Sequence, residues 1–302
     1  MCDWHACGKT GKPGGFKMTA RRICFLSTDD LDGYTFDDDL AVEPLCELGW
    51  QVETISWHES AVDWNEYAAV IIRTTWDYQH QTDKFLAVLE TIDRSSAVLE
   101  NPLDTVRWNL SKTYLREMQE RGCPIVPTIW DARYTEESFF KWQDALGTPE
   151  LIIKPTVSAT AQHTHRLNSF DPQLAETFAT REFMVQPFVP AIVTEGEYSL
   201  FYFGGKFSHA INKAPKAEDF RVQEEHGGLI TAVDPEKELL DVGRKVLILI
   251  DQELLYARVD LVRDPDGQFV LMELELIEPA LYFRMDANSP RLFAREFDRR
   301  MR

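Results

Sequence analysis

The hydrophobic positions in the first third of the chain predict strands that alternate with helices. Four segments contain the short apolar runs of strands: 21–28, 51–57, 67–78 and 97–108. The third is continuously apolar from Ala68 to Ile72, as is typical of a parallel sheet, and the fourth runs into a loop punctuated by Pro102. The segments 36–50 and 82–96 between them have the period of amphipathic helices. This alternation predicts an open α/β domain over about residues 19–108.

The rest of the chain mixes helices with antiparallel strands. Helical periodicity marks four segments: 111–121, 137–146, 235–250 and 291–301. Strands are expected at 149–155 and 182–190, and a short one follows Gly122. Two hairpins are predicted: 196–215, which turns at Gly204 and Gly205, and 255–278, which turns at residues 265–267. The pattern therefore predicts an α+β fold for this part of the chain.

The stretch LMELELIEP, residues 271–279, places carboxylates inside an apolar run. Side chains alternate faces along a strand, so Glu273 and Glu275 share one face, roughly 7 Å apart. The partner strand of the hairpin adds Asp260 to that face. Three half-buried carboxylates repel one another unless a cation lies among them, and oxygen ligands without histidine or cysteine suit Mg²⁺. The alternative is a solvated sheet face paired with Arg258 and Arg263.

Several lysines and an arginine lie at positions where a positive charge suggests that an anion is bound. Lys154 ends a strongly apolar strand, where a buried lysine needs an anion or loses its charge; the alternative is a side chain that reaches the surface. Lys112 lies in the predicted first turn of a helix, a position that the helix dipole disfavours for a cation. Lys213 precedes a polar loop with Arg221 and the pair of glycines 227–228, whose backbone N–H groups can approach phosphate.

Composition limits the possible partners. The formal net charge of −18 repels nucleic acid, so a nucleotide site must be a local cationic patch. No apolar run approaches the roughly 20 residues of a membrane span, and the first residues lack a secretory signal. Five scattered cysteines indicate reduced thiols and a cytoplasmic protein. We expect the leader 1–18 to be disordered; its Cys2, His5 and Cys7 make only three ligands for a metal.

Phosphate-binding motifs with known spacing are absent from the sequence. It contains no Gly-x-x-x-x-Gly-Lys-Ser/Thr loop and no Gly-x-Gly-x-x-Gly fingerprint. The Gly-x-Ser-x-Gly elbow, which carries a nucleophilic serine, is also absent. The segments RTTWDY, VRWNLSKTYL, IIKP, EYSLFYFGGKFSHAINK, DFRVQEEHGG and MELELIEP together resemble an ATP-grasp ligase over about residues 20–300. They are most similar to the branch that contains the cyclo-ligase of D-cycloserine biosynthesis, which acts on O-ureido-serine. Glutathione synthetase and D-alanine:D-alanine ligase are more distant likenesses.

The resemblance implies a pre-ATP-grasp domain followed by two α+β subdomains, 109–189 and 190–302, which clasp ATP. The positions that match nucleotide-binding residues are Lys112, Lys154, Gln186, Phe188, Val189, Glu197 and Lys213. The positions that match metal ligands, for one or two Mg²⁺ ions, are Asp260, Glu273 and Glu275. Lys213 and Arg221 would face the transferred phosphoryl group. Many ATP-grasp enzymes have Glu-x-Asn where this chain has Glu-x-Glu, which leaves the metal geometry open.

The implied activity is ATP-dependent ligation of a carboxylate to an amine or another nitrogen nucleophile through an acyl phosphate, on a small amino-acid-like substrate or peptide. Candidates for holding the substrate carboxylate are Arg258 and Arg284, because a guanidinium binds it bidentately. Candidates at the carboxyl end of a parallel strand, where such sheets bind ligands, are Arg73, Thr74, Trp76 and Asp77. The alternatives are intramolecular cyclisation, a catalytically silent ATP-binding regulator and a metal-binding protein without nucleotide. A homodimer is possible.

Overall fold

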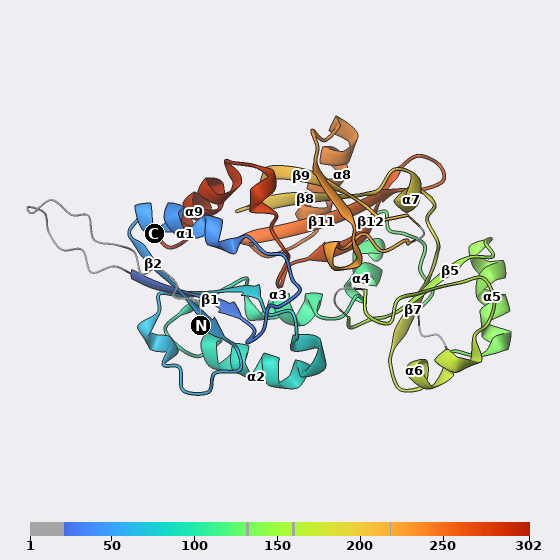
Figure 1. The fold of residues 1–302 in the computed structure, drawn as a ribbon, viewed down its shortest axis with the longest axis horizontal. Coiled ribbons are helices and arrows are strands. Elements are labelled where there is room, and N and C mark those ends of the chain that lie inside the picture. The colour runs from blue at the N-terminus through green and yellow to red at the C-terminus, as the bar shows by residue number, and fades with distance from the viewer. Residues whose placement is uncertain (1–20, 131–132, 159–160, 218) are drawn as a thin grey trace, which may run out of the picture.

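Three β-sheets organise the computed structural model, which describes residues 21–130, 133–158, 161–217 and 219–302 (Figure 1). The leader lies outside the described residues. The first sheet is parallel, in the order β2-β1-β3-β4, and its strands are β1 (Arg21–Ser27), β2 (Trp50–Ser56), β3 (Ala69–Thr74) and β4 (Val98–Glu100). Alternate residues of β1 pack on opposite faces: Phe25 faces α1 (Val42–Glu47), and Leu26 faces α2 (Thr82–Asp93). The predicted open α/β domain is therefore observed.

Two local expectations after β4 were wrong. The predicted loop after Pro102 is a helix, α3 (Leu103–Asn109), with Pro102 at its N-cap. The proline is compatible with this helix because the first turn leaves its N–H groups unpaired in any case. The segment after Gly122 is not a continuous strand. It makes isolated bridges, Ile125 to Leu271 and Ile129 to Val185, which connect it to two different sheets.

The helix predicted at 111–121 is shorter than expected. It forms α4 (Tyr114–Glu120), so Lys112 lies in the turn between α3 and α4 and not in a first helical turn. The argument from the helix dipole therefore does not apply to Lys112. The Lys112 backbone N–H donates to the carbonyl of Thr156 at 2.7 Å, which holds this turn against the segment that follows β5 (Leu151–Pro155).

The second sheet is small and antiparallel, in the order β6-β5-β7. It consists of β5, β6 (His165–Leu167) and β7 (Phe183–Pro187), and it packs against α5 (Glu136–Leu146) and α6 (Ala175–Ala179). Thr135 caps α5 by accepting a hydrogen bond from the Ser138 N–H, and Gly147 ends it with a φ of 64°. Figure 1 shows this sheet set apart from the other two, at the right of the molecule.

The third sheet contains both predicted hairpins, in the order β10-β9-β8-β11-β12. Its strands are β8 (Glu197–Phe203), β9 (Lys206–Ala214), β10 (Leu229–Ala232), β11 (Tyr256–Arg263) and β12 (Phe269–Glu275). Strand β10 and the short helix α7 (Ala191–Thr194) were not predicted from the sequence. Helix α8 (Lys237–Ile248) packs on this sheet, and α9 (Ser289–Arg300) returns to pack against α1 (Figure 1). Short 3₁₀ helices occupy Asp38–Ala41, Trp64–Glu66, Tyr78–His80, Pro172–Leu174, Glu224–His226 and Phe283–Met285.

Two buried polar side chains join the first sheet to the third. The Asn101 amide donates to the carbonyls of Tyr256 and Leu276 and accepts from the Leu255 N–H. The Tyr256 hydroxyl donates to the carbonyls of Ile72 and Ile277, each at 2.8 Å. Buried hydrogen bonds of this kind fix the two sheets relative to each other, since breaking them leaves polar groups unpaired.

Each sheet takes its strands from one of the three segments predicted as structural units, although the exact domain boundaries stay a prediction. Among the helices that the structure describes, none has the length and apolar character needed to cross a membrane.

Candidate active site

A pocket lies where the three sheets meet, and charged side chains of both signs line it. The cationic residues of its lining are Lys112, Lys154, Lys213, Arg221 and Arg258. The acidic residues are Glu197, Glu225, Asp260, Glu273, Glu275 and Glu278. The turn before α4 supplies Lys112, β5 supplies Lys154, and the third sheet supplies most of the rest. One pocket thus brings together residues more than 160 positions apart in the sequence.

Most of the predicted site residues line this pocket. Those that do are Trp76, Lys112, Lys154, Gln186, Val189, Glu197, Lys213, Arg221, Arg258, Asp260, Glu273 and Glu275. Those that lie elsewhere are Arg73, Thr74, Asp77, Phe188 and Arg284. Their predicted contacts with nucleotide or substrate therefore have no support from the geometry.

The residues at the end of β3 mostly have structural partners. Arg73 is 1% exposed, and its guanidinium donates to Asp38 at 2.9 Å and to the Pro279 carbonyl at 2.8 Å. The Thr74 hydroxyl is hydrogen-bonded to that of Ser27, and Asp77 accepts from the Trp57 indole at 2.7 Å. Their hydrogen bonds are made with other protein groups, in the N-terminal domain and, for Arg73, also at Pro279 after β12.

Arg284 and Phe188 likewise make protein contacts outside the pocket lining. Arg284 forms ion pairs with Asp37, at 3.0 Å, and with Glu224. The Arg166 guanidinium lies 3.6 Å from the centre of the Phe188 ring. Arg284 therefore ties a loop of the N-terminal domain to the loop after β9, and its contact with the substrate stays a prediction.

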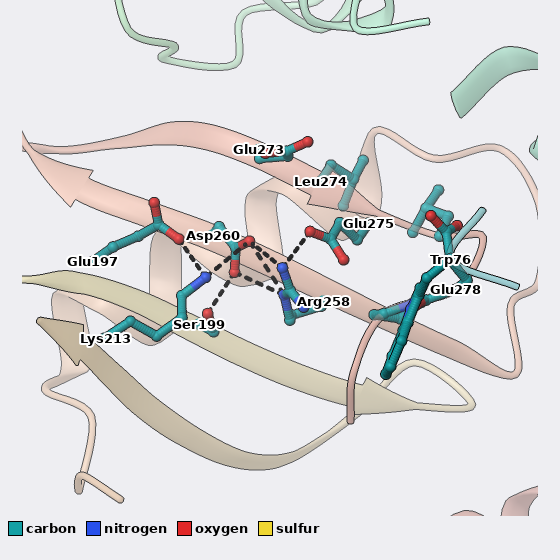
Figure 2. A network of polar contacts seen from close by, with 12 residues as sticks. Trp76, Glu197, Ser199, Lys213, Arg258, Asp260, Glu273, Leu274, Glu275 and Glu278 are labelled. Atoms are coloured by element: carbon teal, nitrogen blue, oxygen red, sulfur yellow. Dashed lines mark hydrogen bonds and ion pairs between the residues drawn. The ribbon is translucent and has the colours of Figure 1, made fainter. Parts of the chain in front are cut away.

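Lys213 lies between two buried carboxylates, as Figure 2 shows. It forms ion pairs with Glu197 and, at 3.4 Å, with Asp260. Burial opposes its charge, but these two carboxylates raise the pKa of Lys213 above its usual value. Burial raises the pKa of Glu197 even with Lys213 beside it. The lysine side chain is 4% exposed, so this network is shielded from solvent.

The Arg258 guanidinium forms ion pairs with both Asp260 and Glu275 (Figure 2). The pairs follow from the register of the hairpin, which places Arg258 opposite Glu275 and Asp260 opposite Glu273. Arg258 and Lys213 overcome the effect of burial and lower the pKa of Asp260. For Glu275 the balance is reversed: burial and the neighbouring carboxylates raise its pKa to about 8 although Arg258 is close. The site therefore contains more acidic groups than its own cations can neutralise.

The two lysines from the central segment face the same strand. Lys112 forms an ion pair with Glu273 at 3.0 Å and donates to the Ser158 carbonyl at 2.8 Å. Lys154 is 8% exposed, and among the described residues none accepts a hydrogen bond or forms an ion pair with it. Burial lowers the pKa of Lys154, although Glu273 partly offsets this. A buried ammonium group without a direct partner is well suited to an anionic ligand.

The carboxylates suit a magnesium ion by charge and by ligand type. Glu275 and Glu278 both have raised pKa values, to about 8 and about 7, because burial and mutual repulsion disfavour their charged forms. A divalent cation would relieve this repulsion, and oxygen ligands are those that Mg²⁺ prefers. Across the described parts of the chain, no group of three or more acidic, histidine or cysteine side chains is arranged to hold a metal ion. The predicted ligands Asp260, Glu273 and Glu275 therefore stay a prediction.

Many lining residues were not predicted as site residues. Those with ionisable side chains include Tyr34, Tyr78, Glu225, Glu278 and Tyr282. Glu278 carried a signal in the sequence as the last carboxylate of the LMELELIEP stretch, and Tyr78 and Glu225 lie in the segments RTTWDY and DFRVQEEHGG. The tyrosines come from loops whose approach depends on how the first and third sheets pack.

The raised pKa of Glu275 predicts a pH-dependent stability. Between about pH 4.5, where an unfolded glutamate titrates, and about pH 8, the folded state binds more protons, so the free energy of unfolding falls as pH rises. We expect Glu275→Gln to melt at a higher temperature than the wild type at pH 8.5 and to lose most of this advantage by pH 5. Thermal unfolding from pH 5 to 9 measures the difference. Glu238→Gln, on the exposed surface of α8, is the control; parallel profiles for wild type and Glu275→Gln would contradict the assignment.

The comparisons with known proteins agree with this geometry. Residues 23–101 match the family model described as "D-cycloserine synthetase DcsG, N-terminal domain". The cycloserine biosynthesis protein DcsG of Streptomyces lavendulae is 27% identical over 291 residues, which are 90% of this chain and 97% of that protein. The crystal structure of D-cycloserine synthetase DcsG superposes with a TM-score of 0.80 at 26% identity and covers 93% of this chain and all of the other.

A more distant structure shares the fold. D-alanine–D-alanine ligase from Bacillus anthracis superposes with a TM-score of 0.65 at 13% identity and covers 93% of this chain and 97% of its own. The chain has the ATP-grasp fold, and its similarity to D-cycloserine synthetase and to ATP-grasp ligases is consistent with an ADP-forming ligase that makes carbon–nitrogen bonds. Within that class it is a homologue of D-cycloserine synthetase.

Proposed function

We propose that the protein is an ATP-dependent carboxylate–amine ligase that acts through an acyl phosphate on a small amino-acid-like substrate. The observation that carries the proposal is the pocket in which Lys112, Lys154 and Lys213 converge on a strand with alternating carboxylates. The lysines suit the phosphates of ATP, and the carboxylates suit its magnesium ions.

The nucleotide would lie between the second and third sheets. Gln186 and Val189, which line the pocket at the end of β7, would contact the base. Lys112 and Lys154 would bind phosphate oxygens, and Glu197 lies next to Lys213 on the neighbouring strand β8. Asp260, Glu273 and Glu275 would hold Mg²⁺, which would neutralise charge on the phosphates.

The reaction needs positioning and charge compensation but no covalent bond to the protein. An oxygen of the substrate carboxylate attacks the γ-phosphorus of ATP, and the bond to the β-phosphate oxygen breaks to give an acyl phosphate and ADP. A nitrogen nucleophile then attacks the acyl carbon, loses a proton and displaces inorganic phosphate. Arg258 and Lys213 line the pocket beside the metal positions, where fixed positive charge would stabilise the transferred phosphoryl group. Arg221, which also lines it, is paired with Asp219 at 2.8 Å and would have to exchange that partner for phosphate.

Intramolecular ring closure is a second candidate. It is favoured by the match to a cycloserine biosynthesis protein, which extends over nearly the full length of both chains. In this version the nucleophilic nitrogen belongs to the same molecule as the activated carboxylate. One substrate is then consumed for each ADP formed, and the product is lighter than the substrate by one water.

The test is an ADP-release screen with Mg·ATP against amino acids, amino-acid derivatives such as O-ureido-D-serine, and small peptides. ADP release that depends on one carboxylate substrate, with a product seen by mass spectrometry, supports the ligase. The product mass separates joining from cyclisation. Binding of Mg·ATP in calorimetry without carboxylate-dependent ADP release would instead support the silent regulatory alternative. The absence of any Mg·ATP binding would overturn the proposal.

A further inference from the structure

Strand β12 is an edge strand of the third sheet, and it carries both Glu273 and Glu275. One edge of β12 pairs with β11, whereas the backbone groups of its other edge need partners from elsewhere. At Leu274 and just after the strand, at Leu276, no strand of the described chain lies along this outer edge. Two side chains take the place of a strand there.

Asn109 and Tyr114 supply the missing hydrogen bonds. The Tyr114 hydroxyl accepts from the Leu274 N–H at 2.7 Å. The Asn109 amide group donates to the Leu274 carbonyl at 2.9 Å, and its oxygen accepts from the Leu276 N–H, also at 2.9 Å. Asn109 and Tyr114 are both buried. They therefore reproduce the hydrogen bonds of a neighbouring strand beside the carboxylates of the pocket.

The same two residues enclose the turn that carries Lys112. Asn109 ends α3 and Tyr114 begins α4, so Lys112 lies in the connection between them. The Lys112 ammonium group pairs with Glu273 at 3.0 Å, and Glu273 directly precedes Leu274 in β12. The turn is thus hydrogen-bonded to β12 on both sides of Lys112, next to the residue that the lysine contacts.

Lys112 depends on this support more than Lys154 does. Lys154 belongs to β5, where pairing with β7 fixes its backbone. Lys112 lies in no helix or strand, and its ammonium group is at the end of a flexible stem of four carbons. A cation that is loosely placed must be ordered when it binds phosphate, and a preorganised one avoids that cost. The hydrogen bonds of Asn109 and Tyr114 place the turn before any ligand binds.

We propose that Asn109 and Tyr114 are positioning residues, which hold the Lys112 ammonium group at the place where the nucleotide phosphates bind. The inference rests on the proposed ligase function and adds two residues that act through Lys112. Asn109 and Tyr114 both line the pocket, but their polar groups are engaged by the backbone of Leu274 and Leu276. They therefore act on the nucleotide only through the position of the lysine.

The experiment measures the binding of Mg·ATP by calorimetry in Tyr114→Phe, in Lys112→Met and in the double variant. We expect Lys112→Met to weaken binding about 10- to 100-fold, the range for a hydrogen bond to a charged group. Tyr114→Phe, which removes only the hydroxyl group, should weaken it about 3- to 10-fold, because the lysine remains but is less well placed. The double variant should bind as weakly as Lys112→Met and no more weakly, since the hydroxyl acts through the lysine.

Tyr134→Phe is the matched control. The Tyr134 hydroxyl also contacts the backbone, since it donates to the Asp171 carbonyl at 3.0 Å, but it lies in the core beside α5 and outside the pocket lining. This variant should melt at a lower temperature, as Tyr114→Phe does, and keep the wild-type affinity for Mg·ATP. Asn109→Ala, alone and combined with Lys112→Met, should repeat the pattern of Tyr114→Phe and serves if that variant fails to fold.

Three results would overturn this inference and leave the ligase intact. The first is wild-type affinity in Tyr114→Phe. The second is a double variant in which the two losses multiply, because the hydroxyl would then support the pocket as a whole and not the lysine. The third is wild-type affinity in Lys112→Met, which would leave the turn without a cation to position. If the wild type itself does not bind Mg·ATP, both proposals fall.

Discussion

Lys154→Met is expected to remove activity without destabilising the protein. Lys154 is buried at the end of β5, and its ammonium group makes no direct hydrogen bond or ion pair with a described residue, although the charge of Glu273 is near. Methionine has a similar length and no charge, so the free variant should melt at the same temperature as the wild type or higher. In turnover, the loss of one preorganised positive charge at the phosphates should lower kcat/KM by about 10²- to 10³-fold.

Steady-state ADP release and thermal unfolding of the same preparation test this prediction. Lys141→Met on α5, where the side chain is 70% exposed, is the matched control and should alter neither quantity. Added Mg·ATP should raise the melting temperature of the wild type and of the control more than that of Lys154→Met. A marked loss of stability in Lys154→Met would show that the lysine supports the fold and would weaken its assignment to the nucleotide.

Lys213→Met is expected to show the opposite behaviour, with a large loss of stability. Lys213 forms an ion pair with Glu197 and another with Asp260 at 3.4 Å, in a network shielded from solvent. Asp260 keeps Arg258 and the Ser199 hydroxyl, but Glu197 would be left as a buried charge. Removing one partner of a buried pair costs about 3–5 kcal/mol of unfolding free energy. We expect about 3 kcal/mol at pH 8, because Asp260 is partly compensated.

Urea denaturation at two pH values tests the cause of this loss. The pKa of Glu197, already raised by burial, should rise further without Lys213, so the deficit should shrink as pH falls from 8 to 5.5. The double variant with Glu197→Gln removes the uncompensated charge and should recover most of the stability but none of the activity. A double variant no more stable than Lys213→Met would show that packing, and not charge, caused the loss.

The sequence predicted the parts of the fold that depend on local patterns. The four parallel strands, both hairpins and the charged face of β12 follow from apolar period, turn residues and strand alternation. Helix α3 was not predicted, because a proline can indicate either a loop or the start of a helix. Pro102 lies at the N-cap of α3. The bridges of Ile125 and Ile129 have partners in two different sheets, and pairing of that kind has no local signature.

Site residues could be predicted from the sequence where their position on a strand decides which face the side chain lies on. Residues that reach the pocket from loops were harder to predict. Lys154, Lys213 and Asp260 lie on strands that face the pocket, and they were found. Arg73 was expected to face the ligand because it ends a parallel strand, but Asp38 from a neighbouring loop takes its guanidinium. Tyr34 and Tyr282 approach the pocket from loops that are distant in sequence, so nothing local indicated them.

The contacts of Asn101 and Tyr256 decide which part of the molecule can move when a nucleotide enters. They fasten the parallel sheet to the five-stranded sheet through hydrogen bonds at 2.8–2.9 Å between buried groups. The β5–β7 layer is attached to the rest mainly by the strand-like segment before α5 and by the turn at Lys112. Two of the three sheets are therefore fastened to each other, and we expect any movement around a bound nucleotide to take place between them and the third.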